Sequence, residues 1–279
     1  MSTHVTKDSE SNTRDSASSA VQEDSCTFNP SKGFSATDVD NLLDSFEDDY
    51  FLQDSTADIV WQISEVLTHG DSEDPLIIIR DTKTQFGDGF SQIMVYIPSK
   101  NNLFAATTAV LEQLNLNVLN ARISASRGDF NLSNFIVTDA HHQSLSRDED
   151  RREEVRQKLF EELDDPEDYP EIIQRRTPRQ LKHFSFPTEV TFSNDMINQR
   201  TVMEVVTPDR PGLLARIGQI LLSHKLTLIN ARIATLGERV EDVFFISDAD
   251  GEPISEAELC ESLQHEICTQ LDEQVETES

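Results

Sequence analysis

The sequence predicts an α+β fold that contains two copies of one structural unit, and two observations support this prediction. The chain of 279 residues matches itself: adding 110 to the numbers of 95–136 reaches the corresponding residues of a second copy without a gap, as for Asn120 and Asn230. A self-match of this length is typical of a repeated supersecondary unit. The apolar residues also fall into β-branched runs, typical of strands, and into stretches with helical spacing.

The residue pattern of the second copy predicts a strand, a turn, a helix, two strands and a final helix. Residues 203–207 are β-branched and mostly apolar, which is typical of a strand. Apolar residues recur at helical spacing over 211–223, which predicts an amphipathic helix with Asp209 as its N-cap and Pro211 in its first turn. The copy is completed by strands at 226–234 and 240–247 and by a helix at 255–271 that begins with a capping-box pattern.

The first copy repeats this order, and each copy is preceded by one more strand. The first copy has expected strands at 91–97, 118–126 and 131–138 and expected helices at 103–114 and 146–163. The leading strands are expected at 76–80 and 189–193. Two arrangements are open at this point: each leading strand completes the sheet that follows it, or each completes the sheet of the other copy.

Composition predicts how the rest of the chain is organised. The Ser/Thr/Asp-rich start has almost no large apolar residues and is expected to be disordered, and the next segment has a helical apolar pattern. The expected divisions are a disordered tail at 1–33, a helical lead-in at 34–72, a first domain with its leading strand at 73–194 and a second domain at 195–279.

Several segments carry a family resemblance. The PDRPGLL turn at 208–214 and the INARI strand at 229–233 resemble an ACT domain, a small-molecule-sensing module. Longer segments are similar to the C-terminal tandem ACT region of the bacterial PII uridylyltransferase/uridylyl-removing enzyme, namely 48–62, 74–80, 180–193 and 208–260. The resemblance implies two tandem ferredoxin-like βαββαβ (ACT) domains with antiparallel sheets. It also implies glutamine sensing in the regulation of nitrogen metabolism.

The chain departs from this family in its chemistry. The family enzyme has nucleotidyltransferase and HD-type hydrolase domains, and the sequence contains neither a Gly-Ser turn with an Asp-x-Asp pair nor a spaced His and Asp set. We therefore expect a sensory module that is not an enzyme and has no cofactor. The expected partners are an amino acid, with PII or the uridylyltransferase catalytic domains. The alternative is a ligand-independent interaction protein that binds the full-length enzyme or PII, and a homodimer is left open.

The resemblance also implies a ligand site at the turn between the first strand and helix of each copy. Carried over to this sequence, the site residues are Asp209, Pro211, Gly212, Leu213, Leu214, Asn230 and, from the first copy, Asn120. A glycine lets a ligand approach the backbone, and the amides at a helix start favour a carboxylate. Asp209 suits an ammonium group, and an asparagine offers a donor and an acceptor. The first copy lacks the acid and the glycine, so the second is the better site.

Charge and motifs exclude several other functions. The 52 acidic and 23 basic residues give a net charge of −29, and such an acidic protein repels nucleic acid. From the composition we expect neither a signal peptide nor a membrane-spanning stretch, which favours the cytoplasm. The doublet His141–His142 fits a solvated turn better than a metal site. Cys260 and Cys268, eight residues apart on the expected last helix, fit an apolar environment better than a disulfide.

Overall fold

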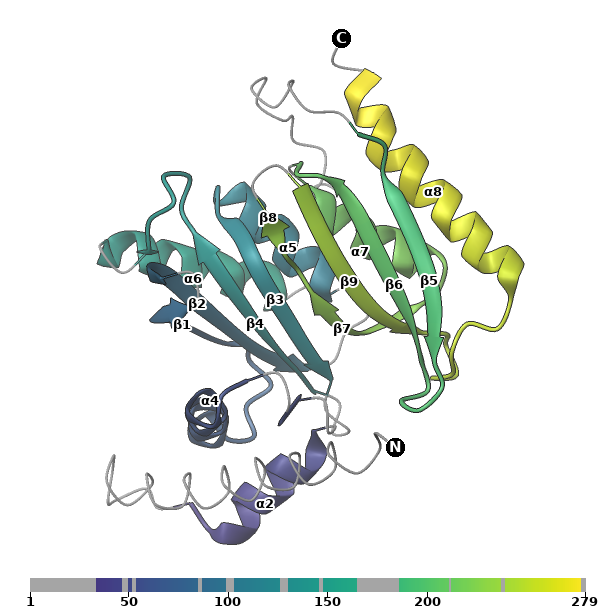
Figure 1. Ribbon diagram of the computed structural model, residues 1–279. Helices are drawn as coiled ribbons and strands as arrows, with labels where there is room; N and C mark the ends of the chain where they lie inside the picture. The colour runs from purple at the N-terminus through teal and green to yellow at the C-terminus, as the bar shows by residue number, and fades with distance from the viewer. Residues whose placement is uncertain are drawn as a thin grey trace. The chain divides into compact units, whose positions relative to one another are not determined.

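The computed structural model describes most of the chain after its first 33 residues (Figure 1). The described residues are 34–46, 50–51, 54–84, 87–98, 103–125, 130–145, 148–164, 186–210, 212–236 and 239–276. They form two compact units, one made of residues up to 76 with 94–99 and 124–132, the other of 77–93, 100–123 and 133–279. The tail expected at 1–33 lies outside the described residues.

The smaller unit contains the helical lead-in. Helix α2 (Ala36–Ser45) begins with a capping box in which Ser35 and Asp38 exchange hydrogen bonds, and α4 (Thr56–His69) is capped by Ser55. Both helices bury one apolar face, as their sequence pattern predicts. Between them the Tyr50 ring stacks on Phe46, with 4.4 Å between the ring centroids. The Tyr50 hydroxyl donates a 2.8 Å hydrogen bond to Gln62 of α4, which satisfies both buried polar groups.

Two sheets with the same topology confirm the repeat. The first contains β1 (Leu76–Thr84), β2 (Gly87–Pro98), β3 (Asn117–Ala125) and β4 (Phe130–Thr138), and the second contains β5 (Glu189–Asp195), β6 (Arg200–Pro208), β7 (Thr227–Arg232) and β9 (Arg239–Ser247). Their orders are β1-β2-β4-β3 and β5-β6-β9-β7, and the two-residue β8 (Thr235–Leu236) pairs with β9. In each sheet the leading strand lies at one edge, beside the first strand of the repeat.

This pairing answers the question that the sequence leaves open. Strand β5 pairs antiparallel with β6, from Glu189 opposite Val206 to Asp195 opposite Arg200. Each leading strand therefore belongs to the sheet that follows it and fills the edge position that a strand after the last helix occupies in a βαββαβ unit. A boundary between 194 and 195 would cut through β5, so the second sheet has to begin at Glu189.

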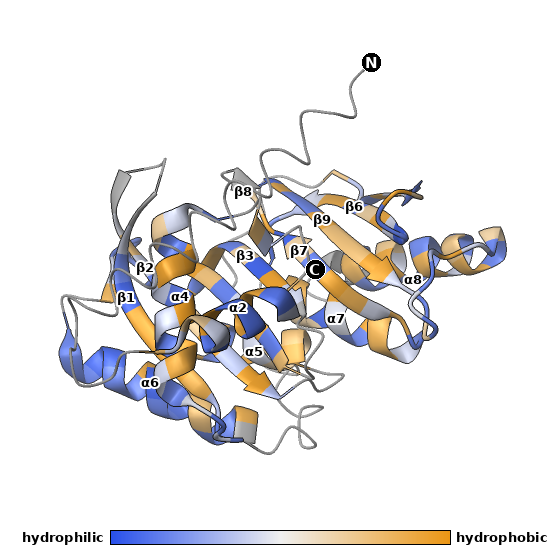
Figure 2. Cartoon of the chain, turned by 90° about the horizontal axis from the view of Figure 1, so that it is seen from below, coloured by the Kyte–Doolittle hydropathy of each residue, from blue (hydrophilic) through white to orange (hydrophobic). Residues whose placement is uncertain are grey.

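The four helices of the repeats are α5 (Leu103–Gln113), α6 (Glu149–Asp164), α7 (Leu213–Ser223) and α8 (Ala257–Glu276). Helices α7 and α8 lie on one face of the second sheet (Figure 1). Helix α6 is mostly hydrophilic in Figure 2, and ion pairs such as Arg151–Glu154 line its exposed surface. Its buried stripe is Val155, Leu159 and Leu163, which has the four-residue spacing of one helix face.

Helices α5 and α7 pack closely, so the two repeats are joined through their first helices. A Cβ atom added at Gly218 of α7 would lie 2.8 Å from the Cβ of Ala105 on α5. The small residues are thus required for the approach of the two backbones. Beside this contact Phe104 of α5 meets Phe244 of β9 edge to face, with 6.1 Å between the ring centroids. Because Phe244 contacts a residue of α5, the face of β9 that carries Phe244 is the face that the helices cover.

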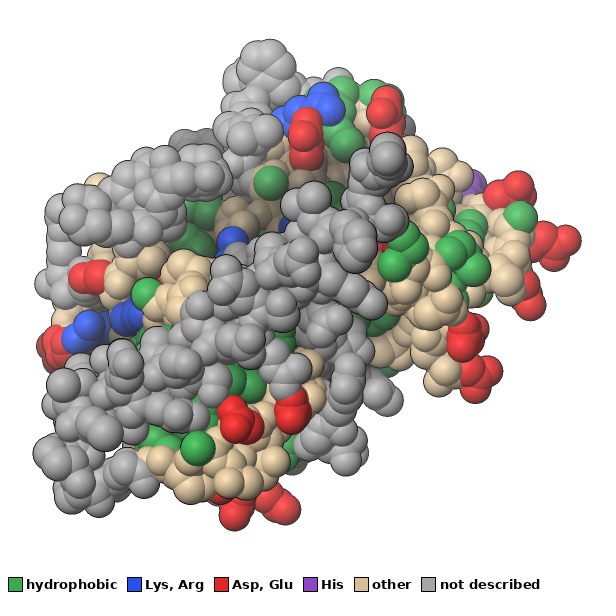
Figure 3. Space-filling model, turned by 60° about the horizontal axis from the view of Figure 1, so that its bottom comes forward, with side chains coloured by type: hydrophobic (Ala, Val, Ile, Leu, Met, Phe, Trp, Pro, Cys, Tyr) green, Lys and Arg blue, Asp and Glu red, His purple; other side chains and the backbone are tan. Residues whose placement is uncertain are grey.

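The surface agrees with the strongly acidic composition. Acidic side chains are spread over the described part of the face in Figure 3. No helix among the described residues is both long and apolar enough to span a bilayer.

Candidate functional site

The turn between β6 and α7 differs from the sequence prediction in how the helix begins. The helix starts at Leu213, and its N-cap is Gly212, which makes no side-chain cap and has a left-handed φ of 76°. Asp209 was the expected N-cap, and that expectation is wrong because the chain makes one more turn before the helix. Pro211 lies outside the described residues. The positive φ explains why glycine stands at 212, since other residues adopt it at a cost.

A carboxylate from the first repeat lies at this turn. Glu112, near the end of α5, accepts a hydrogen bond from the backbone N–H of Gly212. A Cβ atom added at Gly212 would lie 3.5 Å from Oε2 of Glu112. Burial raises the pKa of Glu112, while the Gly212 hydrogen bond and the charge of Arg216 lower it. The start of α7 therefore holds a carboxyl group, whose ionised form the free amides and dipole of a helix N-terminus favour.

A second acid lies on the neighbouring strand β9, opposite Val205 of β6, and the sequence reasoning missed it. Asp242 of β9 is only 1% exposed. Its Oδ1 accepts a 3.2 Å hydrogen bond from the backbone N–H of Ala234, and its Oδ2 is buried without a partner among the described residues. Burial raises the pKa of Asp242 to about 8; the Ala234 hydrogen bond lowers it, and the nearby charge of Asp209 raises it further.

One signal in the sequence could have revealed Asp242. Along β9 every second residue, Val240, Asp242, Phe244 and Ile246, is almost fully buried. A charged residue in the middle of an inward-facing apolar row is unusual and marks a candidate site. The alternation identifies these residues as the buried row only when the strand register is known, which explains why Asp242 was not among the predicted site residues.

Asp209 lies at the rim of the site. It follows the last residue of β6 and is exposed, yet the surrounding protein removes enough water from its carboxyl group to raise its pKa. A backbone hydrogen bond from Arg210 opposes this shift. The charge of Asp209 thus adds to the effect of burial on Asp242, and burial is the first cause of the raised pKa of both acids.

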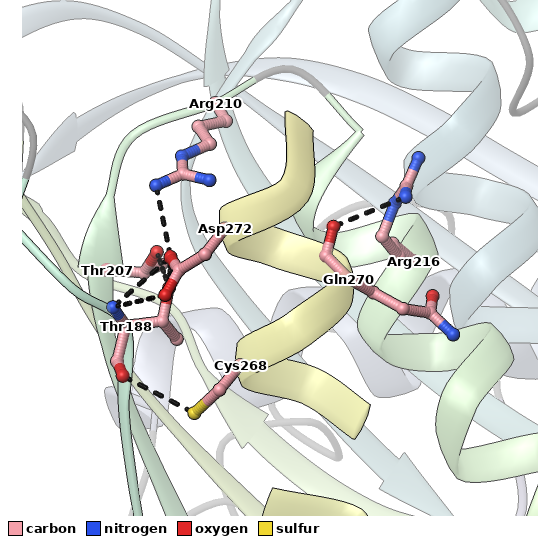
Figure 4. A network of polar contacts seen from close by, with 7 residues as sticks. All are labelled: Thr188, Thr207, Arg210, Arg216, Cys268, Gln270 and Asp272. Carbon is pink, nitrogen blue, oxygen red and sulfur yellow. Dashed lines mark hydrogen bonds and ion pairs between the residues drawn. The ribbon is translucent and has the colours of Figure 1, made fainter. Parts of the chain in front are cut away.

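A polar network ties the turn to the last helix (Figure 4). The carboxylate of Asp272 on α8 accepts a 2.7 Å hydrogen bond from the Thr188 hydroxyl and lies 3.5 Å from Nη2 of Arg210. The Thr188 hydroxyl is also 2.9 Å from that of Thr207, one residue before the end of β6. The edge of the second sheet, the β6–α7 turn and α8 are therefore joined by one acid.

Arg216 extends this connection from α7. Its Nη1 donates a weak 3.5 Å hydrogen bond to the carbonyl of Gln270 on α8 (Figure 4). Nε of Arg216 and Nη1 of Arg210 are buried and have no hydrogen-bond partner among the described residues. Two guanidinium groups thus keep unused donors near the start of α7. Unpaired buried donors favour a bound acceptor, because leaving them unmet costs stability.

The remaining predicted residues lie in different surroundings. Leu213 is buried in the core side of α7, and Leu214 is half-buried. Asn230 is 3% exposed, and its Oδ1 has no partner among the described residues. It is directly opposite Phe245 in the β7–β9 register, so it shares that face of the sheet and lies on the other side from Phe244 and Asp242.

The first repeat does contribute to the turn of the second. The sequence pointed to Asn120, which lies half-buried in β3. The residue that reaches Gly212 is Glu112, ahead of that strand. Within the described part of the chain, no group of three or more His, Cys, Asp or Glu side chains could hold a metal ion. The expected turn at His141–His142 is present, and the His141 N–H donates to Asp139 at 2.8 Å.

Comparison with known proteins agrees with this architecture. Residues 201–259, most of the second repeat, match the ACT domain family. The bifunctional uridylyltransferase/uridylyl-removing enzyme of Azotobacter vinelandii (strain DJ) is 47% identical over 239 residues, which cover 86% of this chain and 27% of that enzyme. The enzyme of the same name from Pseudomonas putida (strain W619) is 48% identical over 240 residues. That of Stutzerimonas stutzeri (strain A1501) is 44% identical over 244 residues.

The match has a defined extent. The chain spans about 27% of the length of these relatives, and the matching part is their C-terminal region. With two sheets of the same topology, the chain has the fold of tandem ACT domains. It therefore contains an ACT domain in its second repeat and is, over most of its length, homologous to the C-terminal region of bifunctional uridylyltransferase/uridylyl-removing enzymes.

Proposed function

We propose that the chain is an amino-acid-sensing regulatory module and that its ligand is glutamine. The observation that carries this proposal is the carboxylate of Glu112 at the N–H of Gly212, beside Arg216. A turn that holds one carboxylate offers the geometry for the carboxylate of an amino acid. Asp209 supplies negative charge a few residues away, as an ammonium group requires.

The remaining parts of the proposal rest on the relatives. Their names describe a uridylyltransferase and uridylyl-removing enzyme, and the chain matches only their C-terminal region. We propose that this region acts in the cytoplasm in nitrogen regulation, without catalytic activity of its own, on PII or on uridylyltransferase catalytic domains. The division into a lead-in at 34–72 and two ACT domains is part of this proposal, with the second domain beginning at the leading strand β5.

Binding would act on the contact between the repeats. Glu112 belongs to α5, and Gly212 lies in the turn before α7, so a ligand carboxylate at Gly212 competes with a contact between the two repeats. A ligand shifts an equilibrium only by its differential affinity for the two states. The ligand carboxylate can bind Gly212 only in the state in which Glu112 has left it, so the ligand's affinity differs between the two states.

The experiment is a thermal melt and a calorimetric titration with L-glutamine. At a hundred times its dissociation constant, a ligand adds about 2.7 kcal/mol to the free energy of unfolding. Gly212→Leu should abolish the binding because its side chain occupies the approach to the backbone and meets a left-handed φ. Asn120→Ala is measured beside it. If Asn120 contributes to the site, this variant should also bind glutamine more weakly. Absence of any shift with every proteinogenic amino acid would favour a ligand-independent interaction protein.

A further inference from the structure

Helix α8 lies along β5, the edge strand of the second sheet, and its side chains bond to the backbone of that edge (Figure 1). Nε2 of Gln264 donates to the carbonyl of Val190 at 2.9 Å. Sγ of Cys268 donates to the carbonyl of Thr188 at 3.3 Å, and both carboxylate oxygens of Asp272 lie 3.3 Å from the N–H of Thr188 (Figure 4). The helix thus bonds to backbone groups that a neighbouring strand would otherwise use.

The spacing of these contacts follows from the geometry of a helix and a strand. Side chains four residues apart share one face of a helix and are separated by about 6 Å along its axis. Backbone groups on one edge of a strand recur at every second residue, about 6.8 Å apart. The step from Gln264 to Cys268 therefore matches the step from Val190 to Thr188, with α8 antiparallel to β5.

The same register explains the position of the second cysteine of α8. One step before Gln264 on the helix is Cys260, and one step beyond Val190 on the strand is Phe192, so the register pairs these two residues. We call Cys260, Gln264, Cys268 and Asp272 the edge stripe. Burial raises the pKa of both thiols, and the charge of Asp272 raises that of Cys268 further. Both thiols therefore stay protonated at neutral pH and can donate a hydrogen bond.

An apolar stripe beside the edge stripe fixes the helix in this position. Leu263, Ile267 and Leu271 are each 0% exposed and also recur every four residues. Their burial anchors α8 on the core of the second repeat. The polar side chains next to them are thereby held at the edge of β5.

An exposed edge strand is a template for pairing with another chain. Strand β5 contains neither Lys nor Pro, two residue types that commonly prevent such pairing, and Thr191 and Ser193 on it are exposed. Two copies of one strand can pair antiparallel about a two-fold axis, which needs no other protein. We propose that α8 takes the place of a neighbouring strand and, through the edge stripe, prevents β5 from pairing with the β5 of a second copy of this chain.

The experiment compares the mass of the full chain with that of Gln264→Ala/Asp272→Ala by sedimentation equilibrium, in salt that screens the acidic surface. The double variant removes the two strongest contacts of the edge stripe and should have twice the mass of the unmodified chain. The matched control is Glu261→Ala/Gln270→Ala, because Glu261 is exposed and the Gln270 side chain bonds to Glu266 of the same helix. The control should keep the mass of the unmodified chain.

Amide hydrogen exchange distinguishes strand pairing from non-specific association. The N–H groups of Val190 and Phe192 point to the same edge as that of Thr188, because backbone direction alternates along a strand. In the associated double variant these two amides should exchange more slowly than in the unmodified chain. A folded double variant with unchanged mass, or association without protection of Val190 and Phe192, would overturn the proposal.

A variant that extends the edge stripe tests its register even if the double variant fails to fold. Cys260→Gln supplies an amide donor opposite the carbonyl of Phe192, and Cys260→Met has a side chain of similar length without that donor. One added hydrogen bond should slow exchange of the Val190 and Phe192 amides about fivefold in Cys260→Gln relative to Cys260→Met. Equal exchange in the two variants would overturn the register. None of these outcomes depends on glutamine binding.

Discussion

Replacing Asp242 by asparagine should make the folded chain more stable at neutral pH. In the unfolded chain an aspartate has a pKa of about 3.9, and in the fold the pKa of Asp242 is about 8. The carboxyl group is thus disfavoured as an ion in the fold. Its contribution to stability is greatest below the unfolded pKa, falls as pH rises between the two values, and is constant above the folded one.

The size of the effect follows from the separation of the two pKa values. Each pH unit between them costs about 1.4 kcal/mol of unfolding free energy. From about 3.9 to pH 7 the cost reaches about 4 kcal/mol. The asparagine of the variant does not titrate, and its amide can fill the same space while accepting the hydrogen bond from Ala234. We therefore expect Asp242→Asn to gain up to about 4 kcal/mol at pH 7.

Urea unfolding of both proteins at several pH values measures this directly. Between pH 5.5 and 7.5 the difference in free energy of unfolding should widen by roughly 3 kcal/mol, because other groups titrate alike in both proteins. Asp209 is the charged group that acts on Asp242, so Asp209→Asn should reduce the slope without removing it. A difference that stays constant with pH would refute the reasoning, since it would mean that Asp242 ionises normally in the fold.

Three further changes test the contacts around the turn. Glu112→Gln should tighten glutamine binding about fivefold in calorimetry, because a neutral amide competes less well for the N–H of Gly212; weaker binding would mean that Glu112 assists the ligand. Gly218→Ala should cost about 1–2 kcal/mol in urea unfolding because the new Cβ meets Ala105, and Ala105→Gly in the same protein should restore part of the loss. Asp272→Asn should cost about 1 kcal/mol, since its side chain is 39% exposed, and an unchanged melting temperature would show that the network of Figure 4 contributes nothing.

The sequence predicts the sheets well, because their signals are local and are present twice. The Asn-Ala-Arg-Ile segments at 120–123 and 230–233 fall in β3 and at the end of β7, at equivalent places in two sheets of the same order. Strand pairing is a long-range property, so the sequence could not decide where the leading strands belong. The end of the strand at Pro208 was also predictable, because proline closes a strand at little cost.

The site could be predicted only in part. Gly212 was identified because a glycine at the start of a helix has a local explanation in its φ. Glu112 was missed because it reaches the turn only through the packing of α5 on α7. Asp242 was missed because its place in the buried row of β9 is recognised only when the strand register is known. The start of α7 shifted from the predicted position because the left-handed residue at 212 replaces a side-chain cap.

The central claim is that an amino acid binds at the β6–α7 turn, and the backbone amide of Gly212 is the most direct reporter of it. Titration of the isotope-labelled chain with L-glutamine, followed by amide NMR, should move the Gly212 resonance in a saturable manner. The amide of Leu213 should move with the same midpoint, since it follows Gly212 at the start of α7. Saturable shifts confined to other parts of the chain, or a Gly212 amide that stays unchanged at saturating glutamine, would contradict the account.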